Sequence, residues 1–195
     1  MAHNGTLIPV PGRDIMVQAW YQGGLSVFDF TNPRRPVEIA YFDRGAIDPA
    51  QLTLAGFWSA YWYNGYIYGS EIGRGLDVLE LKASPMLTQN EIDAARTVRF
   101  AGSNLQTQQR LVWPPSFVVA RAYVDQLDRG NGLPAAQVTS IMATLGLAER
   151  QEGEQRRATL TALATRLDRA APNARDARRV RALHATVKGL ASSTE

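Results

Sequence analysis

Side chains that could perform chemistry are sparse in this chain. It contains no cysteine and only two histidines, His3 and His184, and neither has a second histidine four residues away. Because a metal site needs several His, Asp or Glu ligands that converge, we expect both histidines to be solvated or half-buried. The absence of cysteine excludes disulfide bonds and thiolate chemistry.

Four acidic residues near predicted turns raise the question of calcium binding. Loop carboxylates and carbonyls are the ligands that calcium prefers, but their spacing here does not match a calcium-binding loop. We therefore expect no metal and no cofactor. The four residues are Asp43, Asp48, Glu71 and Asp77.

A glycine-rich segment around Ser70, residues 69–75, could suggest a phosphate-binding loop. Such a loop would continue through Lys and Ser or Thr into a helix, whereas this segment precedes a predicted strand, so a tight turn is the better interpretation. The chain has no Gly-x-Ser-x-Gly nucleophile elbow. A carboxylate pair for glycoside hydrolysis stays open, because sequence does not show the separation of two carboxyl groups.

One aromatic cluster is the strongest candidate for a ligand or partner surface. Strand alternation would place Trp58 and Trp62 on one face and Tyr61 and Tyr63 on the other. One face should pack in the core, and the other could stack on a sugar or a peptide. The candidate surface consists of Trp58, Tyr61, Trp62, Tyr63, Tyr66 and Tyr68.

The elements that carry these residues repeat along the chain. Residues 15–30 align without a gap with residues 66–81, which lie 51 positions further on. A strand-rich repeat near that length is typical of a propeller blade. The identical positions are Gly24, Leu25 and Val27 with their counterparts Gly75, Leu76 and Val78.

Turn signals divide the first part of the chain into strands. Gly23-Gly24 and Asn64-Gly65 each predict a tight hairpin, and the two prolines of residues 31–36 predict a turn. A capping box at Thr88 predicts a short helix over 89–96, after which residues 96–100 could return as a strand. The predicted strands are 15–21, 25–30, 37–42, 57–63, 66–68 and 76–81.

Composition changes near Pro114-Pro115, where aromatic residues and glycine give way to alanine and arginine. Ser116 can cap a helix that ends before Gly130, Pro134 suits the first turn of the next helix, and Asn173 with Asp176 resembles a capping box for the last. These amphipathic helices would bury their apolar stripes as a small bundle. The stripes are Val138, Ile141, Met142 and Leu145; Leu160, Leu163 and Leu167; and Val180, Leu183, Val187 and Leu190.

The net charge of +3 is unevenly distributed, because residues 1–112 carry 9 Lys/Arg against 10 Asp/Glu and residues 113–195 carry 12 against 8. This surplus falls short of the dense basic stripe of nucleic-acid-binding proteins, so we expect no nucleic-acid partner. The arginines of the last helix could meet an acidic surface or an anionic lipid, although a solvated face is the plainer interpretation. We expect no transmembrane segment, because no apolar run is long enough, and no signal peptide at the start of this chain.

Residues 23–42 resemble the repeat of bacterial LVIVD-repeat proteins, which carry a Gly-Leu pair, an alternating apolar strand that ends in Asp, and an Asn-Pro turn. The wider block from His3 to about Trp113, which includes residues 57–71, is similar to the C-terminal end of such proteins. The resemblance implies a β-propeller-like, exported or cell-surface protein of mostly uncharacterised function, and it assigns no catalytic residue. The second repeat departs from the pattern, since residues 81–85 replace the Asn-Pro turn.

The predicted fold class is therefore β plus α: a partial β-propeller of about two antiparallel blades in residues 1–113, followed by a small α-helical bundle in residues 114–195. Propellers need about four to eight blades. We expect this chain either to be a fragment of a longer protein, to self-associate, or to cover its open sheet with the helices.

The predicted function is a non-catalytic binding or scaffold module of an exported or cell-surface bacterial protein. A protein or a glycan could bind at the aromatic face. The alternatives are part of a propeller enzyme whose catalytic residues lie in missing blades, and a truncated product without independent function.

Overall fold

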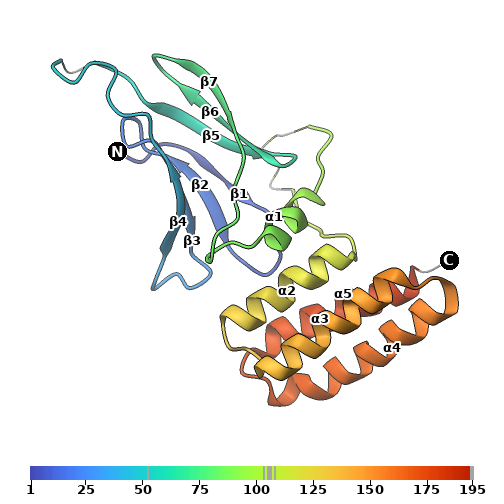
Figure 1. The fold of residues 1–195 in the computed structure, drawn as a ribbon. Coiled ribbons are helices and arrows are strands. Elements are labelled where there is room, and N and C mark those ends of the chain that lie inside the picture. The colour runs from blue at the N-terminus through green and yellow to red at the C-terminus, as the bar shows by residue number, and fades with distance from the viewer. Residues whose placement is uncertain (52, 103, 105–106, 108, 194–195) are drawn as a thin grey trace. The chain divides into compact units, whose positions relative to one another are not determined.

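The computed structural model describes residues 1–51, 53–102, 104, 107 and 109–193. It contains two compact units, residues 1–112 and residues 113–195. The first unit holds two antiparallel sheets and a short helix, and the second is helical (Figure 1).

The first sheet is a meander of four strands in the order β1-β2-β3-β4. Turn chemistry sets its connections: Gly24 has φ +75° at the end of the β2–β3 hairpin, and the Asn32-Pro33 turn leads into β4. The predicted strands here are confirmed, and β1 is an additional strand that pairs with β2. The strands are β1 Gly5–Ile8, β2 Ile15–Ala19, β3 Leu25–Asp29 and β4 Val37–Phe42.

The second sheet has three strands in the order β5-β6-β7. Its hairpin turns at Asn64-Gly65, where both residues have positive φ, +49° and +105°. No fourth strand follows β7 among the described residues of this unit, and the Asn-Pro turn that precedes β4 has no counterpart there. The strands are β5 Phe57–Tyr63, β6 Tyr66–Glu71 and β7 Gly75–Leu79.

The predicted helix over 89–96 is confirmed as α1, Gln89–Arg96, and Thr88 and Glu91 form the expected capping box. The strand predicted over 96–100 is wrong. The amide of Val98 bonds to the carbonyl of Ala95, which continues the turn. The amide of Phe100 donates to the side chain of Asn64 and not to the backbone of a neighbouring strand.

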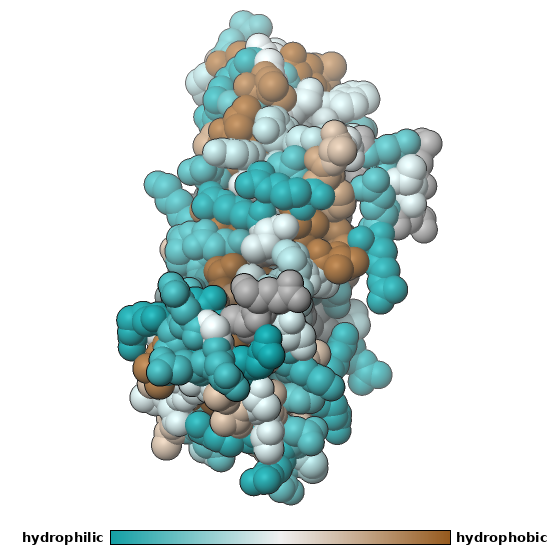
Figure 2. All heavy atoms as spheres, turned by 90° about the vertical axis from the view of Figure 1, so that its right-hand side faces the viewer, coloured by the Kyte–Doolittle hydropathy of each residue, from teal (hydrophilic) through white to brown (hydrophobic). Residues whose placement is uncertain are grey.

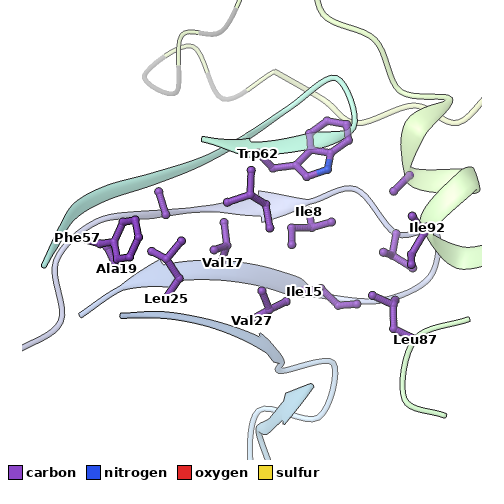
Figure 3. Packing of buried hydrophobic residues seen from close by; sticks show 14 residues of the cluster. Ile8, Ile15, Val17, Ala19, Leu25, Val27, Phe57, Trp62, Leu87 and Ile92 are labelled. Atoms are coloured by element: carbon purple, nitrogen blue, oxygen red, sulfur yellow. The ribbon is translucent and has the colours of Figure 1, made fainter. Parts of the chain in front are cut away.

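The two sheets face each other and share one apolar core. Ile15, Val17 and Val27 of the first sheet lie opposite Phe57 and Trp62 of the second (Figure 3). Ile92 of α1 and Leu87 close one end of this core. Each fully buried side chain of this size contributes about 1.5–3 kcal/mol, so the face-to-face packing is the main force that holds the sheets together.

A buried ion network ties α1 to the first sheet. Arg13 pairs with Asp29 of β3 at 2.7 Å and with the fully buried Glu91 at 2.9 Å, and it also donates to the carbonyl of Met86. Glu91 additionally accepts from the amide of Thr88. Because a buried charge is costly unless it is paired and hydrogen-bonded, this network makes the position of α1 specific.

The second unit consists of four α-helices and one short 3-10 helix within its described residues. Helix α3 packs against α2 and α4, and α5 packs against the same two helices, so the four surround a common core. Most stripe residues are buried, and Met142 and Leu190 are half-buried. The elements are α2 Phe117–Arg129, α3 Ala135–Arg150, α4 Gly153–Ala170, η2 Ala171–Asn173 and α5 Ala177–Ser192.

Two predicted helix starts in this unit need correction. Asp176 alone caps α5, through its side chain and the amide of Arg179, whereas Asn173 lies in η2 and does not cap. Pro134 is the residue before the first turn of α3 and not part of that turn. None of the described helices is long and apolar enough to cross a membrane.

Candidate functional site

The predicted aromatic cluster divides between the core and the surface because of an irregularity in β5. Phe57 pairs with Glu71 and Ser59 pairs with Ser70, so Trp58 is an extra residue at a β-bulge. A bulge re-aims the side chains on one side of it. The expectation that Trp58 and Trp62 share a face is therefore wrong: Trp62 is 5% exposed in the core, whereas Trp58 is 50% exposed.

The four tyrosines of the cluster lie together on the outer face of the second sheet. Tyr61 pairs with Tyr68 and Tyr63 pairs with Tyr66 across β5 and β6, whereas the core residue Trp62 pairs with Ile67. Directly opposite residues of an antiparallel pair share a face, so the tyrosines face away from the core. The prediction that Tyr61 and Tyr63 share a face is confirmed.

Most of these tyrosines have structural partners. The hydroxyl of Tyr61 accepts a 2.7 Å hydrogen bond from the side-chain amide of Asn4, and the hydroxyl of Tyr63 donates to the carbonyl of Phe100 at 3.0 Å. The ring centroids of Tyr63 and Tyr68 lie 6.4 Å apart. Tyr66 is the most exposed of the four, at 42%.

A pocket of about 1030 Å³ lies beside Trp58. Of the predicted aromatic cluster, only Trp58 lines this pocket. The other aromatic residues of the pocket are Trp20 and Tyr21, which are not among the residues of the predicted candidate surface. Figure 2 shows hydrophobic residues on the surface of the strand-rich unit, in the upper half of the view, among hydrophilic ones. The pocket is lined by Met1, Trp20, Tyr21, Gln22, Gly23, Ser26, Glu38, Thr53, Leu54, Ala55 and Trp58.

The pocket residues Tyr21 and Trp58 form a cluster of three rings with His3, which does not itself line the pocket. The imidazole of His3 lies 4.5 Å from the indole of Trp58 and 5.0 Å from the phenol of Tyr21, measured between ring centroids. Tyr21 and Trp58 meet edge to face at 5.8 Å. Edge-to-face pairs are a favoured geometry for aromatic rings, so these contacts hold the Trp58 ring in one orientation.

The backbone of Tyr21 is strained and held from both sides. Its φ of +54° is rare for a bulky residue. Its amide and carbonyl bond to the carbonyl and amide of Phe57 at 3.2 and 2.9 Å. Gly56, with φ +94°, approaches so closely that a Cβ there would lie 2.0 Å from the carbonyl carbon of Tyr21. Strain of this kind costs about 1–3 kcal/mol and persists where surrounding contacts impose it, often at a binding site.

The polar groups of the pocket come from the outer face of the first sheet and from the loop after it. The hydroxyl of Ser26 donates to the carboxylate of Glu38 at 2.6 Å, and the side-chain amide of Gln22 donates to the backbone carbonyl of Thr53 at 2.6 Å. Glu38 is the only lining side chain that carries a charge at neutral pH. The pocket thus combines exposed indole surface with one carboxylate.

The four acidic residues considered for calcium serve local structure. Asp43 and Asp48 each accept a hydrogen bond from a backbone amide two residues further on. Glu71 accepts from the amide of Gly56, and Asp77 pairs with Arg44. The described residues contain no group of three or more His, Cys, Asp or Glu side chains that could hold a metal ion.

The remaining candidates lie on different elements. Ser70 is an exposed residue within β6, in the hairpin that leads to β7. His184 lies on α5 in the other unit, in a polar hollow of about 540 Å³ between α4 and α5. His3 contacts two rings of the aromatic pocket, Tyr21 and Trp58, without lining the pocket itself.

The chain matches no protein-family model, no curated protein and no solved structure.

Proposed function

We propose that residues 1–112 form a ligand-binding module, that its binding site is the aromatic pocket, and that it acts as part of a β-propeller of the LVIVD-repeat type in an exported or cell-surface protein. The observation that carries the proposal is the pocket of about 1030 Å³ with Trp58 in its wall. Ligand pockets have volumes of roughly 300–1,000 Å³ and combine apolar walls with a few polar groups.

The rings are exposed but held in place. Trp58 and Trp20 leave 50% and 36% of their surfaces open, while Tyr21 is fixed by its backbone bonds to Phe57. A rigid aromatic surface binds with a small loss of side-chain entropy. Exposed apolar groups of this size that gather at one pocket are typical of a recognition site.

Three features support the propeller part of the proposal. Both sheets are antiparallel meanders stacked face to face. They touch between β5 and the strands β1 and β2, while a hollow of about 980 Å³ separates β3 and β4 from β6 and β7. A gap that widens from the first strands to the last is what radially arranged blades produce. Gly24 and Gly75, at matching positions of the repeat, both have positive φ.

Binding is tested by calorimetric titration of the whole chain with a panel of soluble oligosaccharides and peptides. We expect Trp58→Ala to weaken binding by up to about tenfold, because one stacked aromatic ring contributes about 0.5–1.5 kcal/mol. Tyr66→Ala is the matched control, since Tyr66 is similarly exposed but lies on the outer face of the second sheet. A loss with Tyr66→Ala and none with Trp58→Ala would move the site to the tyrosine face and contradict the proposal.

A further inference from the structure

The side-chain charge of the aromatic pocket is one-sided. Glu38 is its only charged side chain, and Ser26 is the one partner that the described structure gives to this carboxylate. No described arginine or lysine side chain lines the pocket or pairs with Glu38. The side chains of the pocket therefore contribute negative potential, while Met1, which also lines it, carries the positively charged α-amino group of the chain.

The aromatic walls of the pocket also favour a positively charged ligand. The face of an indole carries the negative lobe of the ring quadrupole, and tryptophan attracts organic cations more strongly than tyrosine or phenylalanine does. Two partly exposed indoles, Trp20 and Trp58, line the pocket together with the carboxylate of Glu38. Rings and carboxylate together favour a positively charged group over a neutral one.

The size of the pocket indicates what carries that charge. About 1030 Å³ is far more space than one ammonium group fills. Leu54, which is largely exposed, adds apolar surface at the same pocket. A peptide segment with apolar residues beside a basic one would use the rings, the carboxylate and this apolar surface at once.

We infer that the aromatic pocket binds a lysine or arginine side chain from a peptide segment of a partner protein. The inference rests on the proposed function, because it names the ligand class of the same site. The basic group lies against the indoles of Trp20 and Trp58 and pairs with the free side of the Glu38 carboxylate, and the flanking residues of the peptide contact Leu54.

The test is calorimetric titration of the whole chain with two short capped peptides at one ionic strength. The first is acetyl-Leu-Lys-Leu amide, and the second has norleucine in place of lysine, which keeps the alkyl chain and removes the charge. We expect the lysine peptide to bind about tenfold more tightly, since a cation between indole faces and a carboxylate gains about this much over a neutral group.

Two variants test whether Glu38 causes the preference for the lysine peptide over the norleucine peptide. Glu38→Gln is expected to weaken binding of the lysine peptide by about fivefold and to leave the norleucine peptide unchanged. Glu38 is exposed, so this change does not disturb the core. Glu154→Gln, in the first turn of α4, removes the same charge in the other unit and is expected to have no effect.

Two further probes, choline and cellotriose, separate the other outcomes. Equal binding of the two peptides, or no effect of Glu38→Gln, would overturn the inference. Tighter binding of choline than of the lysine peptide would replace the peptide with a small quaternary ammonium ligand. Binding of cellotriose alone, dependent on Trp58, would overturn the inference and leave the proposed function intact, whereas loss of all binding would remove both.

Discussion

At the scale of single residues, the pocket depends on Tyr21, whose unusual backbone joins the two sheets. The residue pairs with Phe57 through its backbone and touches His3 and Trp58 through its ring. Gly56 makes this possible, because its missing side chain lets the two segments approach. The strain at Tyr21 and the exposure of Trp58 are thus parts of one arrangement.

Gly56→Ala is expected to destabilise the strand-rich unit by more than about 1 kcal/mol. Alanine at φ +94° is strained, and its Cβ would lie 2.0 Å from the Tyr21 carbonyl carbon. Urea unfolding monitored by tryptophan fluorescence measures the loss. Gly102→Ala is the control, because φ there is not positive and a Cβ would meet nothing within 4 Å; equal midpoints for the two variants would contradict the close approach.

Asp29 makes the stability of the strand-rich unit depend on pH. Burial opposes ionisation of Asp29, but hydrogen bonds from the hydroxyl and amide of Thr31, together with Arg13, outweigh it and lower the pKa below its usual 3.8. A lowered pKa in the folded state stabilises the fold above the unfolded-state pKa, and this gain is lost as pH falls through the folded value.

The advantage in unfolding free energy of wild type over Asp29→Asn is therefore expected to be constant above about pH 5 and to shrink below about pH 4. Denaturant unfolding at a series of pH values measures it. A difference that is unchanged down to pH 2 would show that ionisation of Asp29 contributes no stability.

At the scale of elements, much of the strand pattern was predictable, because glycine turns and β-branched runs act locally. Asn64-Gly65 and the Thr88 capping box form as expected. The bulge at Trp58 was not predictable, since it arises from the pairing of Phe57 with Glu71 and with Tyr21 across the sheets. Strand β1 has only four residues and depends on its pairing with β2.

The candidate site was predicted only in part for the same reason. Trp58 was in the predicted cluster, but Trp20, Tyr21 and Glu38 belong to other segments and join it through tertiary contacts. Conversely, Trp58 does not share the core face with Trp62, because the bulge breaks the alternation on which the prediction rested. An aromatic residue just before a glycine turn, as at Tyr21-Gln-Gly-Gly24, is the one local signal that could have drawn attention to Tyr21.

Gly75→Val tests the turn at the start of β7. The residue has φ +93° and open space where a Cβ would lie, so the penalty is conformational and not steric. We expect a loss of about 1–3 kcal/mol in thermal or urea unfolding. Gly75→Asn is the matched variant, because asparagine tolerates positive φ better than a β-branched residue does; equal losses for the two would contradict this conformational origin.

At the scale of the whole molecule, the chain combines two units of different character. The strand-rich unit exposes apolar residues on the outer face of its second sheet, Leu76 and Val78 among them. The helical unit buries the apolar stripes of its helices in its own core, for example at Val138, Leu163 and Leu183. Each unit has a core of its own.

Residues 113–193 are therefore expected to fold on their own. The caps at Ser116 and Asp176 and the shared core of the four helices lie within this segment. Circular dichroism of the isolated segment should show a helical spectrum and a cooperative thermal transition. A coil-like spectrum would show that its helices need residues 1–112.

The most direct test of the aromatic pocket uses the four tryptophans of the chain as internal reporters. Each indole N–H gives one signal in a ¹⁵N–¹H correlation spectrum, and only Trp20 and Trp58 line the pocket. During titration with the capped lysine peptide, we expect the signals of Trp20 and Trp58 to move while those of Trp62 and Trp113 stay in place. Signals that do not move, or movement confined to Trp62 or Trp113, would contradict the assignment of the pocket as the binding site.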